Sequence, residues 1–189
     1  MERLLNIDLL PKDLEKIASY LQPLTLKKGE LFIEYGKRNN KIGIMQNGLM
    51  ISTYISPKGK EEVSRIYSLI NGNNIVSNHE SFHYDKHSTE NIIAIEETCL
   101  FVLTKEKLEK IIIQYPEVES IIKEVSEKSY INAIERIKEF QSYKAKERIE
   151  IHYNKYKELF SRVGKQQLSS FLGVNRNDFT KFLREINEN

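Results

Sequence analysis

The stretch GKQQLSSFLGVNRNDFTKFLREI, residues 164–186, decides the fold of this chain. Leu168 and Leu172 lie on one side of a short helix, and Gly173 ends that helix because glycine adopts a left-handed backbone at little cost. Asn175 is a good N-cap for the helix that follows. Two helices joined by a short turn that contains glycine form a helix-turn-helix. The stretch therefore predicts that motif.

The second predicted helix has two unlike faces. Its apolar residues recur at helical spacing and would pack against the first helix: Phe179, Phe182, Leu183 and Ile186. Its outer face carries basic, amide and hydroxyl side chains: Arg176, Asn177, Thr180, Lys181 and Arg184. Such groups match the major groove of DNA, where lysine and arginine bind guanine and asparagine binds adenine. The simpler alternative is an ordinary helical hairpin whose outer face is only solvated.

Residues 24–103 have the pattern of an antiparallel β structure. Short β-rich runs alternate with turns that contain glycine: Gly29, Gly48, Gly59 and Gly72. Glycine accepts the positive φ angles that tight turns require. We therefore expect an antiparallel β-roll here, preceded by an amphipathic helix over residues 8–21.

Two further helices are predicted after the roll. The first covers residues 105–114 with Thr104 as its cap, and Pro116 suits the first turn of a longer helix that runs to Tyr143. The long helix repeats apolar residues at three- and four-residue spacing: Val118, Ile121, Ile122, Val125, Tyr130, Ile134 and Ile137. This stripe indicates either a helix packed on its own subunit or a seam between two subunits, and we favour the seam.

The charge of the chain is unevenly distributed. The net charge is only +2 over 189 residues, of which 40% are hydrophobic, as in ordinary globular proteins. Residues 141–189 hold ten Lys and Arg against six Asp and Glu, whereas the first 140 residues hold 19 against 21. A basic C-terminal region after a near-neutral N-terminal region favours an anionic partner for residues 141–189.

Several classes of protein are excluded by what the sequence lacks. Its apolar runs are too short to span a bilayer and its N-terminus does not resemble a secretory signal, so we expect a cytoplasmic protein with no membrane partner. The lone Cys99 excludes an internal disulfide and a multi-cysteine cluster. No P-loop, dinucleotide fingerprint or nucleophile elbow is present, which predicts a protein that is not an enzyme and has no cofactor.

The order of these parts resembles the CRP/FNR family of bacterial transcription regulators, the cyclic-AMP receptor protein and its relatives. The likeness covers nearly the whole chain and is carried by KKGELFIEYGKRNNKIGIMQNGLMI, KAKERIEIHYNKY and QQLSSFLGVNRNDFTKFLREI. It implies an α+β fold with a β-roll sensor-like domain over 1–115, a dimer helix and hinge over 116–143, and a DNA-binding domain over 144–189.

The same resemblance implies a function. A homodimer would read a palindromic site in double-stranded promoter DNA, with Arg176, Asn177 and Lys181 at the family's main base-reading positions. Thr180 and Arg184 are flanking candidates. RNA polymerase would be a further partner if the protein activates transcription, although no motif identifies a contact to it. The alternative is a ligand-sensing or protein-interaction module that has lost specific DNA binding.

The chain departs from the family at the nucleotide pocket. Family members that bind cyclic AMP hold the ribose with a Gly-Glu pair and the phosphate with Arg followed by Ser or Thr. Alignment places the first pair at Ser77 and Asn78 and the second at Ser88 and Thr89, where no arginine stands. A buried phosphate without a cation is poorly compensated. We therefore expect a degenerate effector pocket that cyclic AMP does not control.

Three of the four histidines fall in this segment, at His79, His83 and His87. A spacing of four residues gathers all three rings only on a continuous helix. The resemblance implies a loop and a short helix instead, which would scatter them. We therefore expect no metal site, and the histidines are left as candidates for tuning a non-nucleotide pocket or for sensing pH.

Overall fold

The computed structural model describes residues 17–188, and within them eight strands form two antiparallel four-stranded sheets. Sheet A has the order β1 (Gln22–Leu26), β8 (Thr98–Thr104), β3 (Lys41–Asn47) and β6 (Ile75–Val76). Sheet B has the order β2 (Leu31–Ile33), β7 (Asn91–Ala94), β4 (Met50–Ile55) and β5 (Glu61–Tyr67). The predicted antiparallel roll is confirmed.

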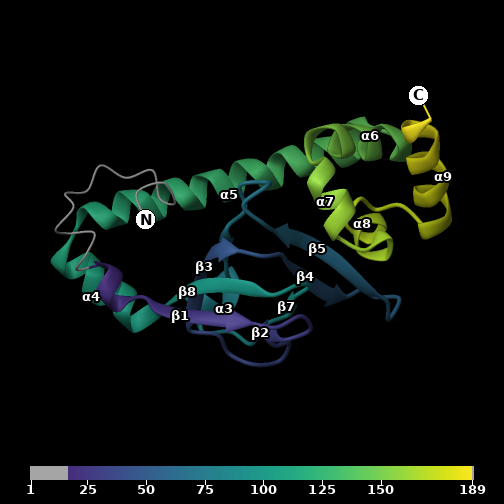
Figure 1. Ribbon diagram of the computed structural model, residues 1–189. Coiled ribbons are helices and arrows are strands. Elements are labelled where there is room, and N and C mark those ends of the chain that lie inside the picture. The colour runs from purple at the N-terminus through teal and green to yellow at the C-terminus, as the bar shows by residue number, and fades with distance from the viewer. Residues whose placement is uncertain (1–16, 189) are drawn as a thin grey trace.

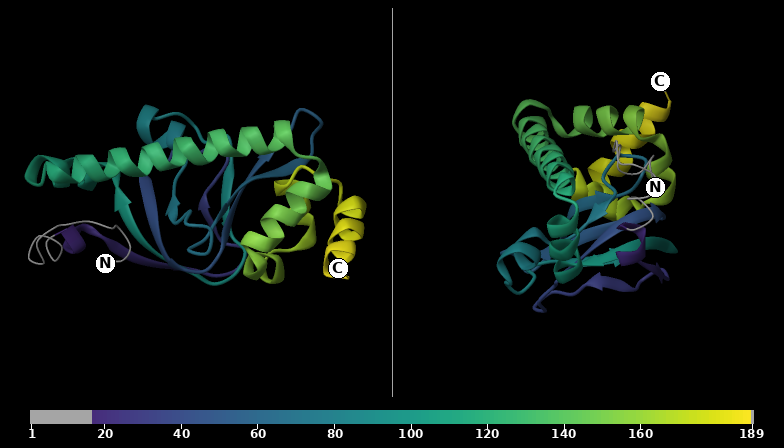
Figure 2. Two further views of the ribbon diagram at one scale, coloured as in Figure 1. Left: turned by 90° about the horizontal axis from the view of Figure 1, so that it is seen from above. Right: turned by 90° about the vertical axis from the view of Figure 1, so that its left-hand side faces the viewer.

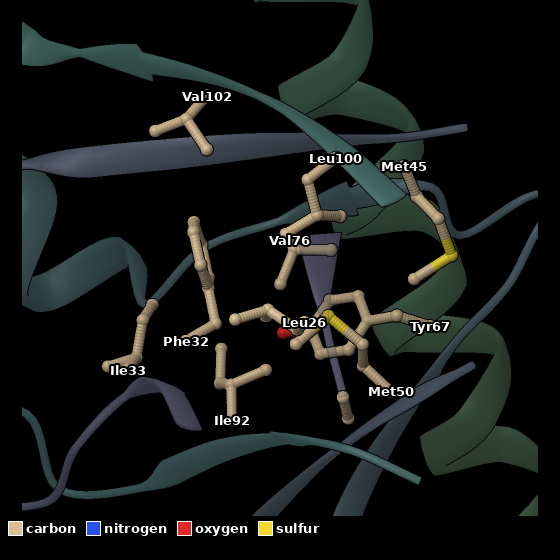
Figure 3. Packing of buried hydrophobic residues seen from close by; sticks show 11 residues of the cluster. Leu26, Phe32, Ile33, Met45, Met50, Tyr67, Val76, Ile92, Leu100 and Val102 are labelled. Carbon is tan, nitrogen blue, oxygen red and sulfur yellow. The ribbon is translucent and has the colours of Figure 1, made fainter. Parts of the chain in front are cut away.

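Every strand contributes to a core between the two sheets, as Figure 3 shows. Successive side chains of a strand point to opposite faces, so Met45 and Leu100 point into this core while Ile42 and Leu103 point away from it. Gly48 joins β3 to β4 with a φ of +97°, and a Cβ there would lie 2.6 Å from the Cα of Thr98. The turn therefore requires glycine both for its backbone and for its space.

A second core fills the outer face of sheet A. There α4 (Lys105–Gln114) and α5 (Glu117–Ser142) pack with Ile17 against β3 and β8. The hydroxyl of Thr104 accepts a hydrogen bond from the Lys107 amide, which confirms the predicted cap. The long helix is also confirmed, and it extends from α4 to the C-terminal helices (Figures 1 and 2). Of the helix predicted over 8–21, residues 17–20 are helical and the part before residue 17 lies outside the described residues.

The third core joins the C-terminal helices to the outer face of sheet B. These helices are α6 (Ala145–Lys155), α7 (Lys157–Arg162), α8 (Lys165–Phe171) and α9 (Arg176–Asn187). Leu49, Ile51, Val63 and Ile66 of the roll share one buried cluster with residues of these helices, among them Phe179. The C-terminal region is therefore packed on the roll rather than suspended beside it. None of the helices within residues 17–188 combines the length and apolarity that crossing a membrane requires.

Candidate nucleic-acid interface and nucleotide cassette

The predicted helix-turn-helix is formed by α8 and α9. The Val174 amide donates to the Ser169 carbonyl at 2.9 Å and the Gly173 amide donates to the Ser170 carbonyl at 3.0 Å, which is the bonding pattern of a Schellman cap. Gly173 has a φ of +63°, as this cap requires. The Asn175 side chain then accepts from the Asp178 amide at 2.9 Å and starts α9. Local sequence signals thus fix the angle between the two helices.

Helix α9 presents the predicted polar residues to solvent. Phe179 is completely buried beneath the helix, where its ring stacks on that of Phe160. The outward side chains are all exposed: Arg176, Asn177, Thr180, Lys181 and Arg184. The Thr180 hydroxyl donates to the Arg176 carbonyl at 2.9 Å, so this threonine offers a partner its methyl group and a free lone pair rather than its proton. Within the described residues this face is basic and amide-bearing.

Contacts on the opposite side hold the motif against the roll. In α8, the Ser170 hydroxyl accepts from the Val63 amide at 2.8 Å and donates to the Glu62 carboxylate at 2.6 Å. The bond from Ser170, helped by Lys60, lowers the pKa of Glu62. Arg162 forms an ion pair with Glu96, which follows β7. Figure 1 shows α8 beside β5 and α9 at the outer end of the molecule.

Arg148 lies beneath the turn, and the sequence analysis missed it. Its side chain is almost completely buried, with its Nε donating to the Leu172 carbonyl at 3.1 Å. Its two Nη atoms donate to the carbonyls of Tyr143 at 2.7 Å and of Gly173 at 3.4 Å. One guanidinium therefore connects the residue that follows α5 to the residues that join α8 and α9. The signal for it in the sequence is its place on the apolar side of the helix, three residues after Ala145 and directly before Ile149.

We use the name cassette for residues 77–90, the segment aligned with the family's nucleotide pocket. Its four predicted pocket residues have different environments. Asn78 caps the short helix α3 (His79–Tyr84), and Ser88 is buried with its hydroxyl donating to the Glu90 carbonyl at 2.7 Å. Thr89 is exposed, and the Ser77 hydroxyl has no hydrogen-bond partner among residues 17–188.

The cassette instead holds a negative side chain of its own. The Glu90 carboxylate accepts from Asn78 Nδ2 at 2.8 Å, from the Ser64 hydroxyl at 3.3 Å and from the Ser52 hydroxyl. Three donors from three segments thus converge on one carboxylate. The sequence analysis also missed Glu90. Its signal is the alternation of the following strand, because Ile92 and Ala94 face the core between the sheets and Glu90 stands two residues before Ile92.

The cation of this region comes from β5 rather than from the cassette. Burial opposes the charge of Arg65, but the neighbouring Tyr67 and Glu90 outweigh it and raise the pKa of Arg65. Burial has the opposite effect on the Tyr67 hydroxyl: it raises the pKa of Tyr67 to about 12, so the hydroxyl stays protonated. The roll therefore carries a positive group on β5 that is exposed at its head, and the half-buried Glu90 carboxylate favours its charge.

The short helix α3 brings two of the three histidines together and leaves the third outside. The rings of His79 and His83 stack on α3 with centroids 5.8 Å apart, while His87 lies beyond the helix in a bridge to Arg38. Within residues 17–188, no three metal-binding side chains converge in a way that could hold an ion. Partial burial lowers the pKa of His79, and the charges of Arg65 and His83 lower it further against the effect of Glu90.

The chain has the fold of a cyclic-nucleotide-binding-like β-roll with a long helix and a helical C-terminal region, and solved structures share this architecture. FixK2 from Bradyrhizobium japonicum superposes with a TM-score of 0.72 at 12% identity, over 89% of this chain and 85% of that one. The c-di-GMP-responsive regulator CLP from Xanthomonas campestris gives 0.70 at 12%, over 94% and 91%. The catabolite activator protein of Thermus thermophilus gives 0.60 at 16%, over 97% and 86%. No protein-family model matches the sequence, and no curated protein matches it either.

Proposed function

We propose that this chain is a DNA-binding transcription regulator of the CRP/FNR type, which reads promoter DNA through α9. The observation that carries the proposal is the exposed face with Arg176, Asn177 and Lys181. It lies on a helix-turn-helix whose second helix is capped and whose first helix is hydrogen-bonded to β5. Lysine and arginine donors suit guanine edges, and an asparagine amide suits adenine. The exposed amides at the start of α9 add a site for phosphate.

We further propose that α5 forms the seam of a homodimer, through its second half. The first half packs on its own subunit, because Val118 is buried and Ile121 and Ile122 join the core on sheet A. Beyond the edge of that core, Tyr130 is 68% exposed and Ile137 is 53% exposed. Apolar side chains at this exposure favour contact with a second copy. Two copies of α9 related by a dyad would then read half-sites about 34 Å apart.

Cyclic AMP is not expected to control this regulator. Glu90 already accepts hydrogen bonds from Asn78 of the cassette and from Ser52 and Ser64 of the neighbouring strands, and a phosphate entering there would meet its negative charge. Arg65 is a basic residue whose charge acts on His79 here, and the nearby Glu90 carboxylate favours the charged form of Arg65. Calorimetric titration with cyclic AMP should therefore give no heat of binding.

Selection from a random DNA pool tests the proposed function. The purified full-length protein should enrich an inverted repeat, and its affinity should fall steeply with salt because phosphate contacts release counterions. Lys181→Ala should weaken binding by roughly 1–3 kcal/mol and relax preference at one base of each half-site. Lys28→Ala, at an exposed lysine between β1 and β2 and outside the proposed dimer seam, is the matched control for the lost charge. A pool without an enriched palindrome would contradict the proposal, and it would favour the interaction module instead.

A further inference from the structure

The Glu90 carboxylate is held by donors that come from three separate segments of the roll. Its Oε1 accepts from Asn78 Nδ2 at 2.8 Å, and its Oε2 accepts from the Ser64 hydroxyl at 3.3 Å and from the Ser52 hydroxyl. Ser52 is completely buried and Asn78 is 5% exposed. Both oxygens of the carboxylate are therefore bonded, and two of the three donors belong to buried side chains.

An irregularity in β5 brings Ser64 to this position. In the pairing of β4 with β5, Ser52 lies opposite Arg65 and Thr53 lies opposite Val63, so β5 has one extra residue, Ser64, between them. This is a β-bulge, and a bulge changes the direction in which a side chain points. The Ser64 hydroxyl lies 3.3 Å from the Glu90 carboxylate and 3.3 Å from the Ser52 carbonyl. The site is therefore built by a local departure from the regular sheet.

The main chain of Glu90 is fixed independently of its side chain. The Ser88 hydroxyl donates to the Glu90 carbonyl at 2.7 Å and accepts from the Glu90 amide at 3.3 Å. Asn78 binds the carboxylate through Nδ2, and through Oδ1 it accepts from the Ser81 amide at 2.8 Å and so caps α3. Glu90 therefore connects the start of α3 to β4 and β5.

The surroundings of the carboxylate suit an oxyanion. A carboxylate only accepts hydrogen bonds, and the two hydroxyls and the amide around it each have a proton to donate. Hydrogen bonds to an ionised acceptor are roughly twice as strong as those between neutral groups. The negative charge of Glu90 also favours the charged form of Arg65. The arrangement is that of an anion-binding site whose anion belongs to the same chain.

The cassette is placed to act on the helix that leads to the helix-turn-helix. His79 and Phe82 of α3 line one pocket together with Ile121 and Val125 of α5. Helix α5 then runs to Ser142, shortly before the C-terminal helices begin. Loss of the Glu90 contacts would loosen the cap of α3, and with it the packing of α3 beside α5.

We propose that Glu90 is an internal ligand of the roll, whose carboxylate fills an oxyanion site formed by Ser52, Ser64 and Asn78. The cassette is then fixed without a molecule from outside. One consequence rests on the proposed function: the regulator binds DNA without a small-molecule effector. The occupation of the site and its consequence for DNA binding are tested by separate measurements.

Chemical rescue by acetate tests the occupation of the site. Glu90→Ala removes a methylene and the carboxylate, which are the parts that acetate supplies. Because Glu90 is half-buried, the truncation opens the site to solvent. Hydrogen exchange of the Ser81 amide should become about tenfold faster, the factor that loss of one hydrogen bond to a charged group gives. Acetate should restore protection in a saturable way, whereas acetamide, which has the same shape without the charge, should not.

Matched variants separate anion binding from a general loss of packing. Ser52→Ala added to Glu90→Ala should abolish the response to acetate, because a buried donor is lost. Glu61→Ala is the control, since Glu61 is an exposed carboxylate of the same sheet that accepts one hydrogen bond, from Thr53 at 2.9 Å. Its Ser81 exchange should stay unchanged. Equal restoration of Glu90→Ala by acetate and acetamide, or no restoration by either, would overturn the proposal.

A variant that keeps the shape of the side chain covers the case in which Glu90→Ala does not fold. Glu90→Gln fills the same space without the charge, so Ser81 exchange should be about three- to tenfold faster and insensitive to acetate. Exchange as slow as in the unaltered chain would show that the charge of Glu90 does not fix the cassette, and the proposal would fail.

DNA binding tests the consequence for regulation. On the inverted repeat that selection enriches, the unaltered protein should have the same affinity with acetate as with sodium chloride at equal ionic strength. Glu90→Ala should bind about tenfold more weakly and recover in acetate. Equal affinity of the two proteins would overturn effector independence through Glu90. A pool without an enriched repeat would refute the proposed function alone, because the rescue at Ser81 is measured without DNA.

Discussion

Replacing Arg148 by methionine removes the guanidinium that connects the end of α5 to the helix-turn-helix. Methionine matches the length of the aliphatic stem, so the packing beside the Phe140 ring is largely kept. The variant deprives three carbonyls of their donor, namely those of Tyr143, Leu172 and Gly173. Two of these bonds are 3.1 Å or shorter, and the third is 3.4 Å.

The magnitude follows from the two shorter bonds. A hydrogen bond to a charged group contributes about 1.5–3 kcal/mol, and hydration of the freed carbonyls returns part of this loss. We therefore expect local opening of the helix-turn-helix to become easier by about 3 kcal/mol, which corresponds to roughly a hundredfold change in the opening equilibrium. The loss should be confined to α8 and α9, because the inter-sheet core makes no contact with Arg148.

Hydrogen exchange measures this opening residue by residue. Protection of the Val174 and Phe179 amides should fall about a hundredfold in Arg148→Met, while protection of Ile92 should stay as it is in the unaltered chain. Lys28→Met is the control, because it removes an exposed charge of the same sign outside the proposed dimer seam. Protection at Val174 and Phe179 within threefold of the unaltered chain would refute the reasoning.

Three further substitutions test separate parts of the molecule. Gly173→Ala should destabilise the chain by about 1–3 kcal/mol in urea denaturation, because the left-handed backbone is strained and the new Cβ lies 2.5 Å from the Phe140 ring; an unchanged midpoint would contradict this. Ser77→Ala should raise the free energy of unfolding by about 1 kcal/mol, because it removes a buried hydroxyl without a partner; a loss of stability would mean that the hydroxyl is bonded after all. His79→Gln should reduce the loss of stability on acidification, because a lowered folded pKa means that the unfolded chain takes up the proton first, below about pH 6.5. If plots of the free energy of unfolding against pH stay parallel for the two proteins from pH 7 to 5.5, His79 does not have that role.

The helix-turn-helix was predictable because its determinants are local. Gly173 and Asn175 mark the cap and the start of α9, and the spacing of Phe179 and Phe182 marks its buried face. Each of these signals acts within a few residues along the chain, so it can be recognised without knowledge of the tertiary fold. Whether α9 contacts DNA stays a prediction, because exposure alone does not identify a partner.

The long helix shows where periodicity is insufficient. Its apolar stripe was interpreted as one seam, yet Val118 and Ile121 pack on their own subunit and Tyr130 and Ile137 are exposed. The spacing of apolar residues reports which side of a helix is apolar, but not how far the neighbouring sheet extends beneath it. That limit is set by strands distant in the sequence.

The cassette shows the same limit for polar residues. Ser77 and Asn78 are adjacent, but the Ser77 hydroxyl has no hydrogen-bond partner within residues 17–188, whereas the Asn78 amide binds Glu90. Arg65 is far along the chain from Ser88, so the sequence alone does not show that its charge acts in this region. Pairing of β4 with β5 and with β7 brings these segments together, and no local pattern specifies that pairing.

The buried cluster shared by the C-terminal helices and sheet B has a mechanical consequence. Swinging the helices away at residue 143 would expose four aliphatic side chains of the roll: Leu49, Ile51, Val63 and Ile66. At about 1.5–3 kcal/mol for each, the cost is on the order of 6–12 kcal/mol, which is comparable with the stability of a whole domain. In the proposed homodimer, each protomer should therefore move as a single rigid body. A change in the distance between two α9 helices would then have to arise by rotation of whole protomers about their contact, not by bending within either one.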